Sequence, residues 1–346
     1  VLENGQGSVY ADFFDIDWQP LDPALRGKVL IPVLGDHYGV VLERGELKLG
    51  FDRETGGFAV SYYAHRFPID PQSYASLLQA AVALLPPNVP AQVQAECQAL
   101  ANAFRHLPAR DTTDPQAREE RQRDKEVHKA RLATLVREQP LLAEAIDRMV
   151  EHYNGRPGER ESFDALDSLL EAQAYRLAYW RVASDEINYR RFFDINDLAA
   201  LRMENPATFE ATHRFVLDLA VEGKIDGIRI DHPDGLYDPA GYFERLQSRY
   251  AQLAGADVDP QTKPLYVVIE KIAAPHEDIP QNWPVYGTTG YRYANVLNGV
   301  FVDTAAKSAM TRTWSSFVGE EALPFEEQAY RGKRLMMRVA LAAELT

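Results

Sequence analysis

The segment DGIRIDHPDGL, residues 226–236, combines carboxylates, an arginine and a histidine with two isoleucines. If it forms a strand, its side chains alternate between faces, so Arg229 and Asp231 share one face while Ile228 and Ile230 pack on the other. A guanidinium beside a carboxylate favours the ionised form by charge and hydrogen bonding, and so lowers its pKa. A carboxylate that stays ionised in a fixed rotamer can act as a nucleophile.

A second carboxyl group follows the apolar run of PLYVVIEKI, residues 264–272. Glu270 comes directly after this run, at the expected carboxyl end of a strand. Partial desolvation there would raise its pKa and keep it protonated near neutrality, so that it could donate a proton. One ionised and one protonated carboxyl on neighbouring strand ends form the pair that glycosidic bond cleavage requires. The two groups lie about 5 to 5.5 Å apart when the anomeric configuration is retained.

Three alternative interpretations remain open at these positions. An Arg-x-Asp pair at a strand end is often a structural ion pair. Asp231, His232 and Asp234 offer oxygen and imidazole ligands that would suit a divalent cation. Glu270, which Lys271 follows, could belong to a solvated strand end. The residue pattern therefore indicates an α/β enzyme with paired carboxylates, and it does not decide between these alternatives.

The elements that would position these side chains alternate from about residue 181 onwards. NYRRFFDIN, IDGIRIDH and PLYVVIEKI have strand character, whereas PATFEATHRFVLDLAVEGK and DPAGYFERLQSRYAQLAG have the apolar spacing of amphipathic helices. Strand, helix, strand, helix, strand predicts a parallel sheet with right-handed crossovers. Catalytic groups in such sheets lie at the carboxyl ends of the strands, which is where Asp231 and Glu270 fall.

The first 180 residues form two regions. Residues 1–72 carry short apolar runs with period-two patterning, including KVLIPVLGD, around Gly35, Gly45 and Gly56, which predicts a small antiparallel sheet. Residues 73–180 have helical spacing. Within them, DPQAREERQRDKEVHKARLATLVREQ is interpreted as a solvated helix face with ion pairs between residues four apart.

Composition limits the classes of partner. Lys and Arg number 37 against 51 Asp and Glu, and the formal net charge of −14 repels nucleic acid and anionic membrane surfaces. Cys97 is the only cysteine, which excludes an intrachain disulfide and favours a reducing, cytoplasmic location. We find no run of about 18 apolar residues and no signal-peptide pattern, so no membrane span is expected.

The sequence resembles a known family at these same residues. GIRIDHPDGL and VVIEKI are similar to the nucleophile and acid/base segments of the α-amylase superfamily. YADFFDIDW, IPVLGDHYG, LLEAQAYRLAYWRVASDEINYRRFFDINDLAALRMENP and WPVYGTTGY narrow the resemblance to the malto-oligosyltrehalose synthase family, over essentially the whole chain. The resemblance implies an α/β fold that is part of a (β/α)8 TIM-type barrel. Residues 1–72 would be an inserted β subdomain, 73–180 a helical insertion, and 181–346 the barrel portion with both carboxyl groups.

The resemblance also implies an activity. The family consists of isomerases that carry out an intramolecular transglucosylation, which turns the reducing-end α-1,4 bond of malto-oligosaccharides into an α,α-1,1 bond in trehalose biosynthesis. No cofactor, metal, nucleic acid or membrane is expected, and a trehalose-releasing hydrolase would act on the product. The alternatives are an α-1,4-glucan hydrolase or transferase of the same superfamily, and an inactive glucan-binding fragment.

The same resemblance assigns residues. Asp231 would be the nucleophile, Glu270 the acid/base and Arg229 their catalytic partner. The expected substrate-binding residues are His232, Asp234, Gly235, Lys271, Arg191, Asn196, Tyr189 and Tyr291.

Two departures from the family pattern stand out. After GTTGY the family usually has an acidic residue and an aromatic, where this chain has Arg292 and Tyr293. The family's first barrel strands are expected to precede Val1, and its third catalytic acid to follow Thr346. We therefore expect the 346-residue chain by itself to show little activity.

Overall fold

The computed structural model describes residues 1–256, 262–274 and 276–345, and these form two compact units. Unit 1 comprises Val1–Ala200 together with the residues from Val339 onwards, and unit 2 comprises Leu201–Arg338. The units group the residues differently from the predicted divisions at 72/73 and 180/181. The assignment of those regions as insertions in a barrel stays a prediction.

Unit 1 contains a parallel pair of strands, β1 (Val29–Leu34) and β5 (Tyr175–Tyr179), whose register pairs Val29 with Tyr175. The sequence predicted that KVLIPVLGD joins the antiparallel sheet, and that prediction is wrong for β1. The partner strand lies more than 140 residues away in the chain, so local periodicity carries no information about it.

The predicted antiparallel sheet is confirmed for the next three strands, β2 (Lys48–Asp52), β3 (Gly57–Tyr62) and β4 (His65–Pro68), which pair in the order β2-β3-β4. Gly56 lies in the turn between β2 and β3 with a φ of +71°. A Cβ atom there would come within 2.1 Å of the backbone oxygen of Lys129. Only glycine therefore fits where this turn meets the helix that carries Lys129.

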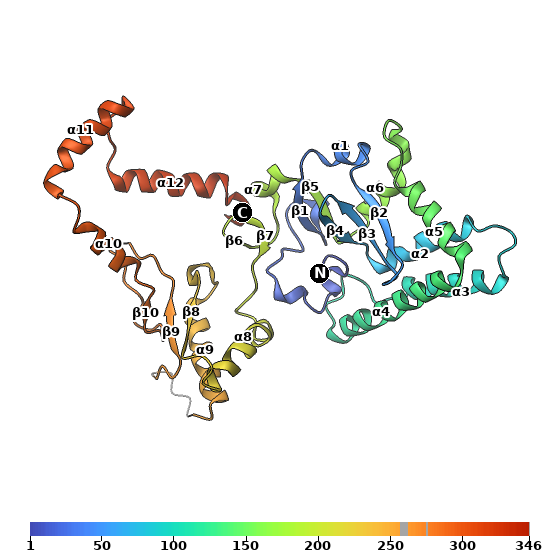
Figure 1. Ribbon diagram of the computed structural model, residues 1–346, viewed down its shortest axis with the longest axis horizontal. Helices are drawn as coiled ribbons and strands as arrows, with labels where there is room; N and C mark the ends of the chain where they lie inside the picture. Colours follow the sequence, from blue (N-terminus) through green and yellow to red (C-terminus); the bar gives the residue numbers. More distant parts are fainter. Residues whose placement is uncertain (257–261, 275, 346) are drawn as a thin grey trace. The chain divides into compact units, whose positions relative to one another are not determined.

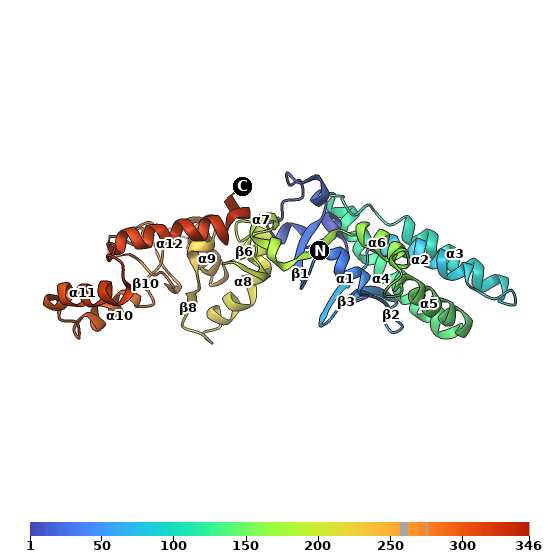
Figure 2. The same cartoon turned by 90° about the horizontal axis from the view of Figure 1, so that it is seen from above.

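The helices of unit 1 are α1 (Tyr38–Glu43), α2 (Tyr74–Ala83), α3 (Ala91–Arg105), α4 (Pro115–Glu138), α5 (Pro140–Tyr153), α6 (Asp164–Glu171), α7 (Ala183–Glu186) and α13 (Ala342–Leu345). Among them, α2 to α5 lie together on one side of these strands, and α7 lies apart from them (Figures 1 and 2). The core between helices and strands includes Leu30, Phe58, Tyr74 and Phe104, each at most 2% exposed. A short antiparallel pair, β6 (Arg191–Phe192) and β7 (Ile195–Ala199), completes the unit.

Helix α4 corrects the interpretation of the charged segment. Arg121 and Lys125 are 0% and 3% exposed, so this helix does not present only a solvated face. Arg121 donates hydrogen bonds to Asn4 Oδ1 at 3.0 Å and to Asp70 Oδ1 at 2.6 Å, and Lys125 pairs with Glu3. These partners are distant in the sequence, unlike the predicted pairs four residues apart. Glu3 and Asn4 fix the N-terminal segment to the helix, and Asp70 fixes the segment that follows β4.

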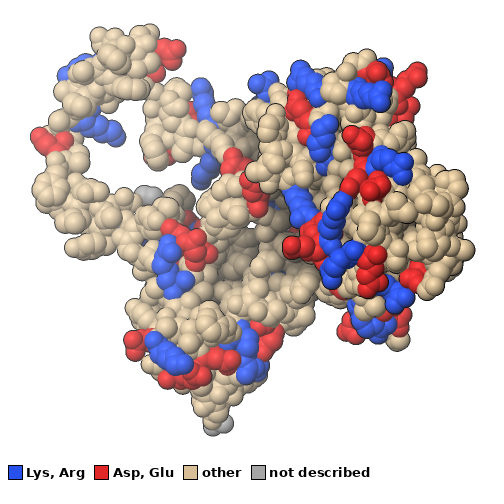
Figure 3. Space-filling model, turned by 45° about the vertical axis from the view of Figure 1, so that its right-hand side comes forward, with Lys and Arg blue, Asp and Glu red and all other residues tan. Residues whose placement is uncertain are grey.

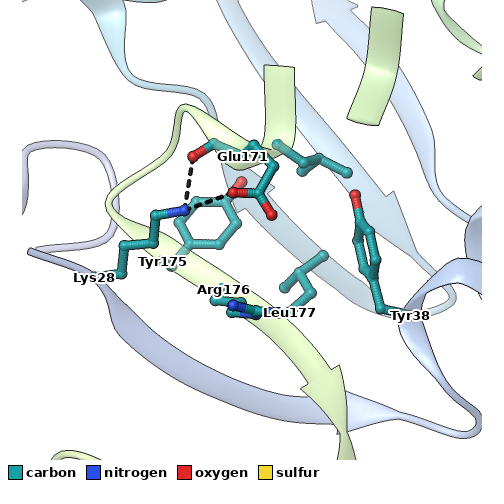
Figure 4. Close-up of a pocket in the computed structure, with 7 residues that line it drawn as sticks. Lys28, Tyr38, Glu171, Tyr175, Arg176 and Leu177 are labelled. Carbon is teal, nitrogen blue, oxygen red and sulfur yellow. Dashed lines mark hydrogen bonds and ion pairs between the residues drawn. The ribbon is translucent and has the colours of Figure 1, made fainter. Parts of the chain in front are cut away.

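A cavity of about 30 Å³ lies at the end of α6, beside β1 and β5 (Figure 4). Lys28 Nζ donates to the backbone oxygen of Glu171 at 2.7 Å and lies 3.1 Å from its carboxylate. Tyr175 is 1% exposed, and its hydroxyl has no hydrogen-bond partner within the described residues. The cavity has room for one water molecule, which suits a small polar site better than a sugar.

Unit 2 carries the alternating pattern that the sequence predicted. Its elements are α8 (Pro206–Val221), β8 (Gly227–Ile230), α9 (Pro239–Leu253), β9 (Tyr266–Ile269), β10 (Gly287–Thr288), α10 (Tyr291–Gly299), α11 (Lys307–Val318) and α12 (Phe325–Val339), which ends at the unit boundary. Local sequence explains where α8 and α9 begin. Asn205 and Asp238 cap the two helices by accepting backbone hydrogen bonds at 2.9 Å, and a proline occupies the first position of each.

The sheet of unit 2 is parallel, in the order β10-β9-β8, which confirms the predicted β8-α9-β9 crossover. Gly227 allows the close approach of β8 to β9, because a Cβ atom there would come within 2.6 Å of the Tyr266 backbone oxygen. The sheets of both units are small and do not close on themselves within the described residues. The structure is thus a mixed α/β fold.

The smaller hydrophobic core packs α8 and α9 against β9. Phe243, Leu246 and Val267 are fully buried in it, and Ile228 and Ile230 of β8 pack at its edge, as strand alternation predicted. Burial of such side chains supplies roughly 1.5–3 kcal/mol each. This core packs against β8 and β9 and so holds the carboxyl ends of the two strands next to each other.

Helices α10, α11 and α12 carry no buried side chain in the described residues. No helix in the described part of the chain has the length and apolar character needed to cross a bilayer. Basic and acidic side chains are interspersed over the face that Figure 3 shows.

Candidate active site

The register of β8 and β9 places the two carboxyl groups side by side. Ile230 pairs with Ile269, and the backbone N–H of Glu270 donates to the Ile230 oxygen at 2.8 Å. Asp231 and Glu270 therefore follow their strands at the same level of the sheet. The prediction that both lie at carboxyl ends of adjacent parallel strands is confirmed.

Arg229 joins the pair. Its Nη2 lies 2.9 Å from Asp231 Oδ1 and 3.1 Å from Glu270 Oε2. The side chains of Arg229 and Asp231 are about half exposed, whereas that of Glu270 is 22% exposed. The predicted contact between Arg229 and Asp231 is confirmed, and the guanidinium contacts the second carboxylate as well.

The predicted order of the two pKa values is wrong for this structure. A hydrogen bond between the two carboxyl groups raises the pKa of Asp231 and lowers the pKa of Glu270, and it is the largest cause of both shifts. Arg229 lowers the pKa of both groups, and in Asp231 its effect is outweighed. The prediction assumed that desolvation would dominate at Glu270, but in this open site the direct contact between the carboxyl groups outweighs it.

Tyr291 approaches the pair from the start of α10, shortly after the third strand, β10. Thr288 of β10 pairs with Ile269, and Gly290, with a φ of +94°, turns the chain into α10. The Tyr291 hydroxyl then donates a 2.6 Å hydrogen bond to Glu270 Oε1. This bond lowers the pKa of Glu270 further and makes Tyr291 a direct neighbour of the carboxyl pair.

The turn after β8 has an unusual backbone. His232 has a φ of +44°, a left-handed conformation that is uncommon for a residue with a side chain. In this conformation its backbone N–H donates to the Glu270 carboxylate. Its ring lies against Gly235, where a Cβ atom would come within 2.7 Å of His232 Cδ2. Both residues thus belong to the turn that frames the carboxyl pair.

Lys271 and Asp234 contact each other. Lys271 Nζ lies 2.9 Å from Asp234 Oδ2 and 2.6 Å from Glu277 Oε1. The sequence pattern did not identify Glu277, which lies in a loop with no pattern of its own.

Arg292, at the departure from the family pattern, lies 4.0 Å from Asp278, and both side chains are exposed.

The three remaining predicted residues lie in unit 1 and contact one another. The Tyr189 hydroxyl donates to the Asn196 backbone oxygen at 2.7 Å, and Arg191 Nη1 donates to Asn196 Oδ1 at 2.8 Å. Arg191 also binds the carboxylate of Glu344, at 2.6 Å from its Nη2. A role for these three residues in substrate binding stays a prediction.

No group of three or more His, Cys, Asp or Glu side chains able to hold a metal ion occurs within residues 1–256, 262–274 and 276–345. Asp231 and Asp234, two of the ligands considered for a divalent cation, are instead paired with Arg229 and Lys271. What the arrangement offers chemically is two interacting carboxyl groups beside a guanidinium, with the Asp231 side chain 56% exposed.

Comparison with known proteins points to one family. No protein-family model matches the chain. A protein of Mycobacterium tuberculosis (strain CDC 1551 / Oshkosh) assigned as a maltooligosyl trehalose synthase is 41% identical over 139 residues, which make up 40% of this chain and 16% of that protein. The corresponding protein of strain H37Rv gives the same values.

The solved structures agree. The maltooligosyltrehalose synthase of Arthrobacter ramosus is similar over 99% of this chain and 30% of its own, with a TM-score of 0.60 and 28% identity. A glycosyltrehalose synthase of strain DSM5389 has a similar fold, with a TM-score of 0.60 and 23% identity over 99% of this chain and 33% of its own. The chain thus spans less than a third of the Arthrobacter enzyme and about a third of the second structure. The predicted resemblance is confirmed: the chain is similar to maltooligosyltrehalose synthases in sequence over 139 residues and in fold over 99% of its length.

Proposed function

We propose that the protein that carries this chain converts the reducing-end α-1,4 bond of a malto-oligosaccharide into an α,α-1,1 bond, as an isomerase of trehalose biosynthesis. One observation carries the proposal. Two carboxyl groups on adjacent parallel strand ends converge on the Arg229 guanidinium in a relative of the maltooligosyltrehalose synthases. Paired carboxyl groups of this kind are the groups that retaining glycoside chemistry uses.

In the proposed mechanism, Asp231 attacks the anomeric carbon of the second glucose from the reducing end. Glu270 protonates the departing glycosidic oxygen, so an ester to Asp231 forms while the terminal glucose is released inside the site. The freed glucose turns round. Glu270, now ionised, takes the proton of its anomeric hydroxyl, and that oxygen displaces Asp231 to form the α,α-1,1 bond. The configuration is retained, and no water is consumed.

Substrate binding would reverse which of the two carboxyl groups, Asp231 or Glu270, has the higher pKa. In the unliganded structure a hydrogen bond joins Asp231 and Glu270, whereas the retaining mechanism places a sugar between the two carboxyl groups. A glucose residue placed between the two groups would break that bond and remove the largest cause of the raised pKa of Asp231. Arg229 would then favour ionised Asp231.

We infer that the protein that carries this chain contains a (β/α)8 barrel. The parallel β8-α9-β9 unit and the parallel pair β1-β5 support this inference. In this arrangement residues 1–72 and 73–180 would be insertions and the region from residue 181 would carry the site. The contact of Tyr291 with Glu270 supports a place for its ring beside the sugar. Substrate contacts by His232, Asp234 and Gly235 follow from the position of their turn, next to Asp231.

Tyr189, Arg191 and Asn196 are retained as proposed substrate-binding residues by family resemblance. A cytoplasmic location is proposed from the single cysteine, Cys97, which is buried and free. A hydrolase that releases trehalose from the product is the proposed functional partner.

A second function is favoured by one observation. The side chain of Asp231 is 56% exposed, and water that reaches the ester would hydrolyse it and make the protein an α-1,4-glucan hydrolase. The two functions give different products from the same substrate.

Incubation with maltopentaose separates them. The mutase removes reducing ends without releasing glucose, whereas the hydrolase creates new reducing ends. The assay uses the protein that carries residues 1–346, with D231N as the inactive variant. D218N is the matched control, because Asp218 also pairs with an arginine, Arg214, but lies on α8. If the number of reducing ends stays unchanged with the unmodified protein, whether or not maltopentaose binds, both functions are contradicted.

A further inference from the structure

We propose that Lys271 is a positioning residue that clamps together the two loops framing the carboxyl pair, by binding Asp234 on one loop and Glu277 on the other. The structural part of this inference stands on the contacts alone, and only its activity readout rests on the proposed function. The role differs from the sugar contact that the sequence predicted for Lys271.

The two contacts are short, and the lysine is shielded while its partners Asp234 and Glu277 are 47% and 41% exposed. Lys271 Nζ lies 2.9 Å from Asp234 Oδ2 and 2.6 Å from Glu277 Oε1, and the Lys271 side chain is only 11% exposed. Exposed ion pairs contribute little to the free energy of folding, because water screens them and long side chains lose entropy on pairing. Shielding of the ammonium group strengthens both attractions and holds the lysine in one conformation. The two carboxylates also raise the pKa of Lys271, so it remains charged.

The first partner fixes the turn after β8. Asp234 lies in the short helical turn Pro233–Gly235, three residues after Asp231. The turn begins at His232, whose left-handed backbone directs its N–H to Glu270. Holding Asp234 therefore holds the backbone that positions both carboxyl groups.

The second partner fixes the loop after β9. Glu277 Oε2 accepts the backbone N–H of Ala274 at 3.2 Å, and the Glu277 N–H donates to the Ala274 oxygen at 2.9 Å. This loop leads to β10 and then to Tyr291, whose hydroxyl binds Glu270. Lys271, the residue next to Glu270, thus connects both chain segments that contact the carboxyl pair.

The charge arrangement favours a clamp over a sugar contact. Two of the three N–H donors of an ammonium group are directed at carboxylates here, which are stronger acceptors than sugar hydroxyls. A lysine that bound sugar in the free protein would have to give up one of these bonds.

Hydrogen exchange tests the clamp directly. In K271M, the backbone amides of Gly235, Leu236 and Glu277 are expected to exchange about tenfold faster or more, since the turns that protect them open more often. The amide of Glu270, bonded to Ile230 within the sheet, should keep its rate. K271R should restore slow exchange.

K224M is the matched control, because it removes an equal charge from a lysine of unit 2 whose ion pair with Glu222 is exposed. It should leave all these amide rates unchanged. Unchanged exchange of Gly235, Leu236 and Glu277 in K271M would overturn the clamp, and so would equal acceleration in K224M.

Steady-state kinetics with maltopentaose separates positioning from binding. A clamp predicts a lower kcat for K271M with little change in KM, because the carboxyl pair loses its geometry. A raised KM with unchanged kcat would mean that Lys271 binds sugar, and would overturn the proposal. If the unmodified protein shows no turnover, the proposed function fails while the exchange result still decides whether the clamp exists.

Discussion

Tyr291 donates a 2.6 Å hydrogen bond to Glu270, a residue 21 positions earlier in the chain and on another element. The bond stabilises the ionised carboxylate, so it lowers the pKa of Glu270. Y291F is therefore expected to raise that pKa, and in the proposed reaction to move the alkaline limb of activity to higher pH, because the acid stays protonated longer.

The shift is measured by NMR titration of the Glu270 side-chain carboxyl carbon. Y293F is the control, since Tyr293 lies on the same helix with an exposed ring. A Glu270 titration that is the same in Y291F and the unmodified protein would show that the hydrogen bond has no effect in solution.

Arg229 contacts both carboxylates and lowers the pKa of each. R229M should therefore raise both pKa values, whereas Y291F acts chiefly on Glu270. The same titration, followed at Asp231 and Glu270, checks this difference. R214M, which removes an exposed arginine from α8, should leave both curves in place. A fall in either pKa in R229M would contradict the assigned role of the guanidinium.

Two glycines of unit 1 allow the cost of a steric clash to be measured separately from the cost of backbone strain. Gly56 and Gly27 have nearly the same φ, +71° and +68°, but only Gly56 faces a close neighbour, the Lys129 backbone oxygen. We expect G27A to cost about 1–2 kcal/mol of unfolding free energy from strain, and G56A to cost at least about 2 kcal/mol more because backbone must move. Urea unfolding of both variants gives the comparison. Equal losses would mean that the turn is not packed against α4 in solution.

Unit 2 contains a partly buried histidine whose titration should affect stability. His213 Nε2 lies 2.7 Å from the Tyr242 hydroxyl, and its ring stacks on Phe209. The Arg245 guanidinium also lies over the Phe209 ring, 5.5 Å from its centroid. Burial lowers the pKa of His213 below its ordinary value of about 6.5. The unfolded chain then binds the proton more readily, so this contribution to stability is complete above about pH 6.5 and declines as the pH falls towards the folded pKa.

H213Q should therefore reduce the loss of stability of unit 2 between pH 7.5 and pH 5.5. H276Q, which removes an exposed histidine of the same unit, serves as control. The NMR titration of the His213 ring gives the folded pKa directly. A midpoint at or above 6.5 would contradict the sign of the predicted effect.

Local sequence was sufficient to predict much of unit 2. Asn205-Pro206 and Asp238-Pro239 mark the starts of α8 and α9, and the apolar runs before Asp231 and Glu270 identify β8 and β9. The parallel arrangement and the convergence of the two carboxyl groups follow from this order of elements. These features depend on neighbours in the chain, which is why periodicity and capping residues indicate them.

Features that depend on distant partners were not predicted. The pairing of β1 with β5 and the burial of Arg121 against Asp70 join segments that are far apart in the chain. The proton order of the carboxyl pair depends on a contact distance that no sequence pattern reports. Glu277 lies in a loop without a sequence pattern, and only the structure shows that it contacts Lys271.

The central claim is that Asp231 is the nucleophile of a glycosyl transfer assisted by Glu270, although Asp231 has the raised pKa in the unliganded structure. The most direct test is to incubate the protein with a 5-fluoro α-glucosyl fluoride, whose ring fluorine slows breakdown of the glycosyl-enzyme, and to map the peptides by mass spectrometry. We predict one added fluoroglucosyl unit on the peptide that contains Asp231, present in D218N and absent in D231N. A label on Glu270, or no labelled peptide at all, would contradict the account.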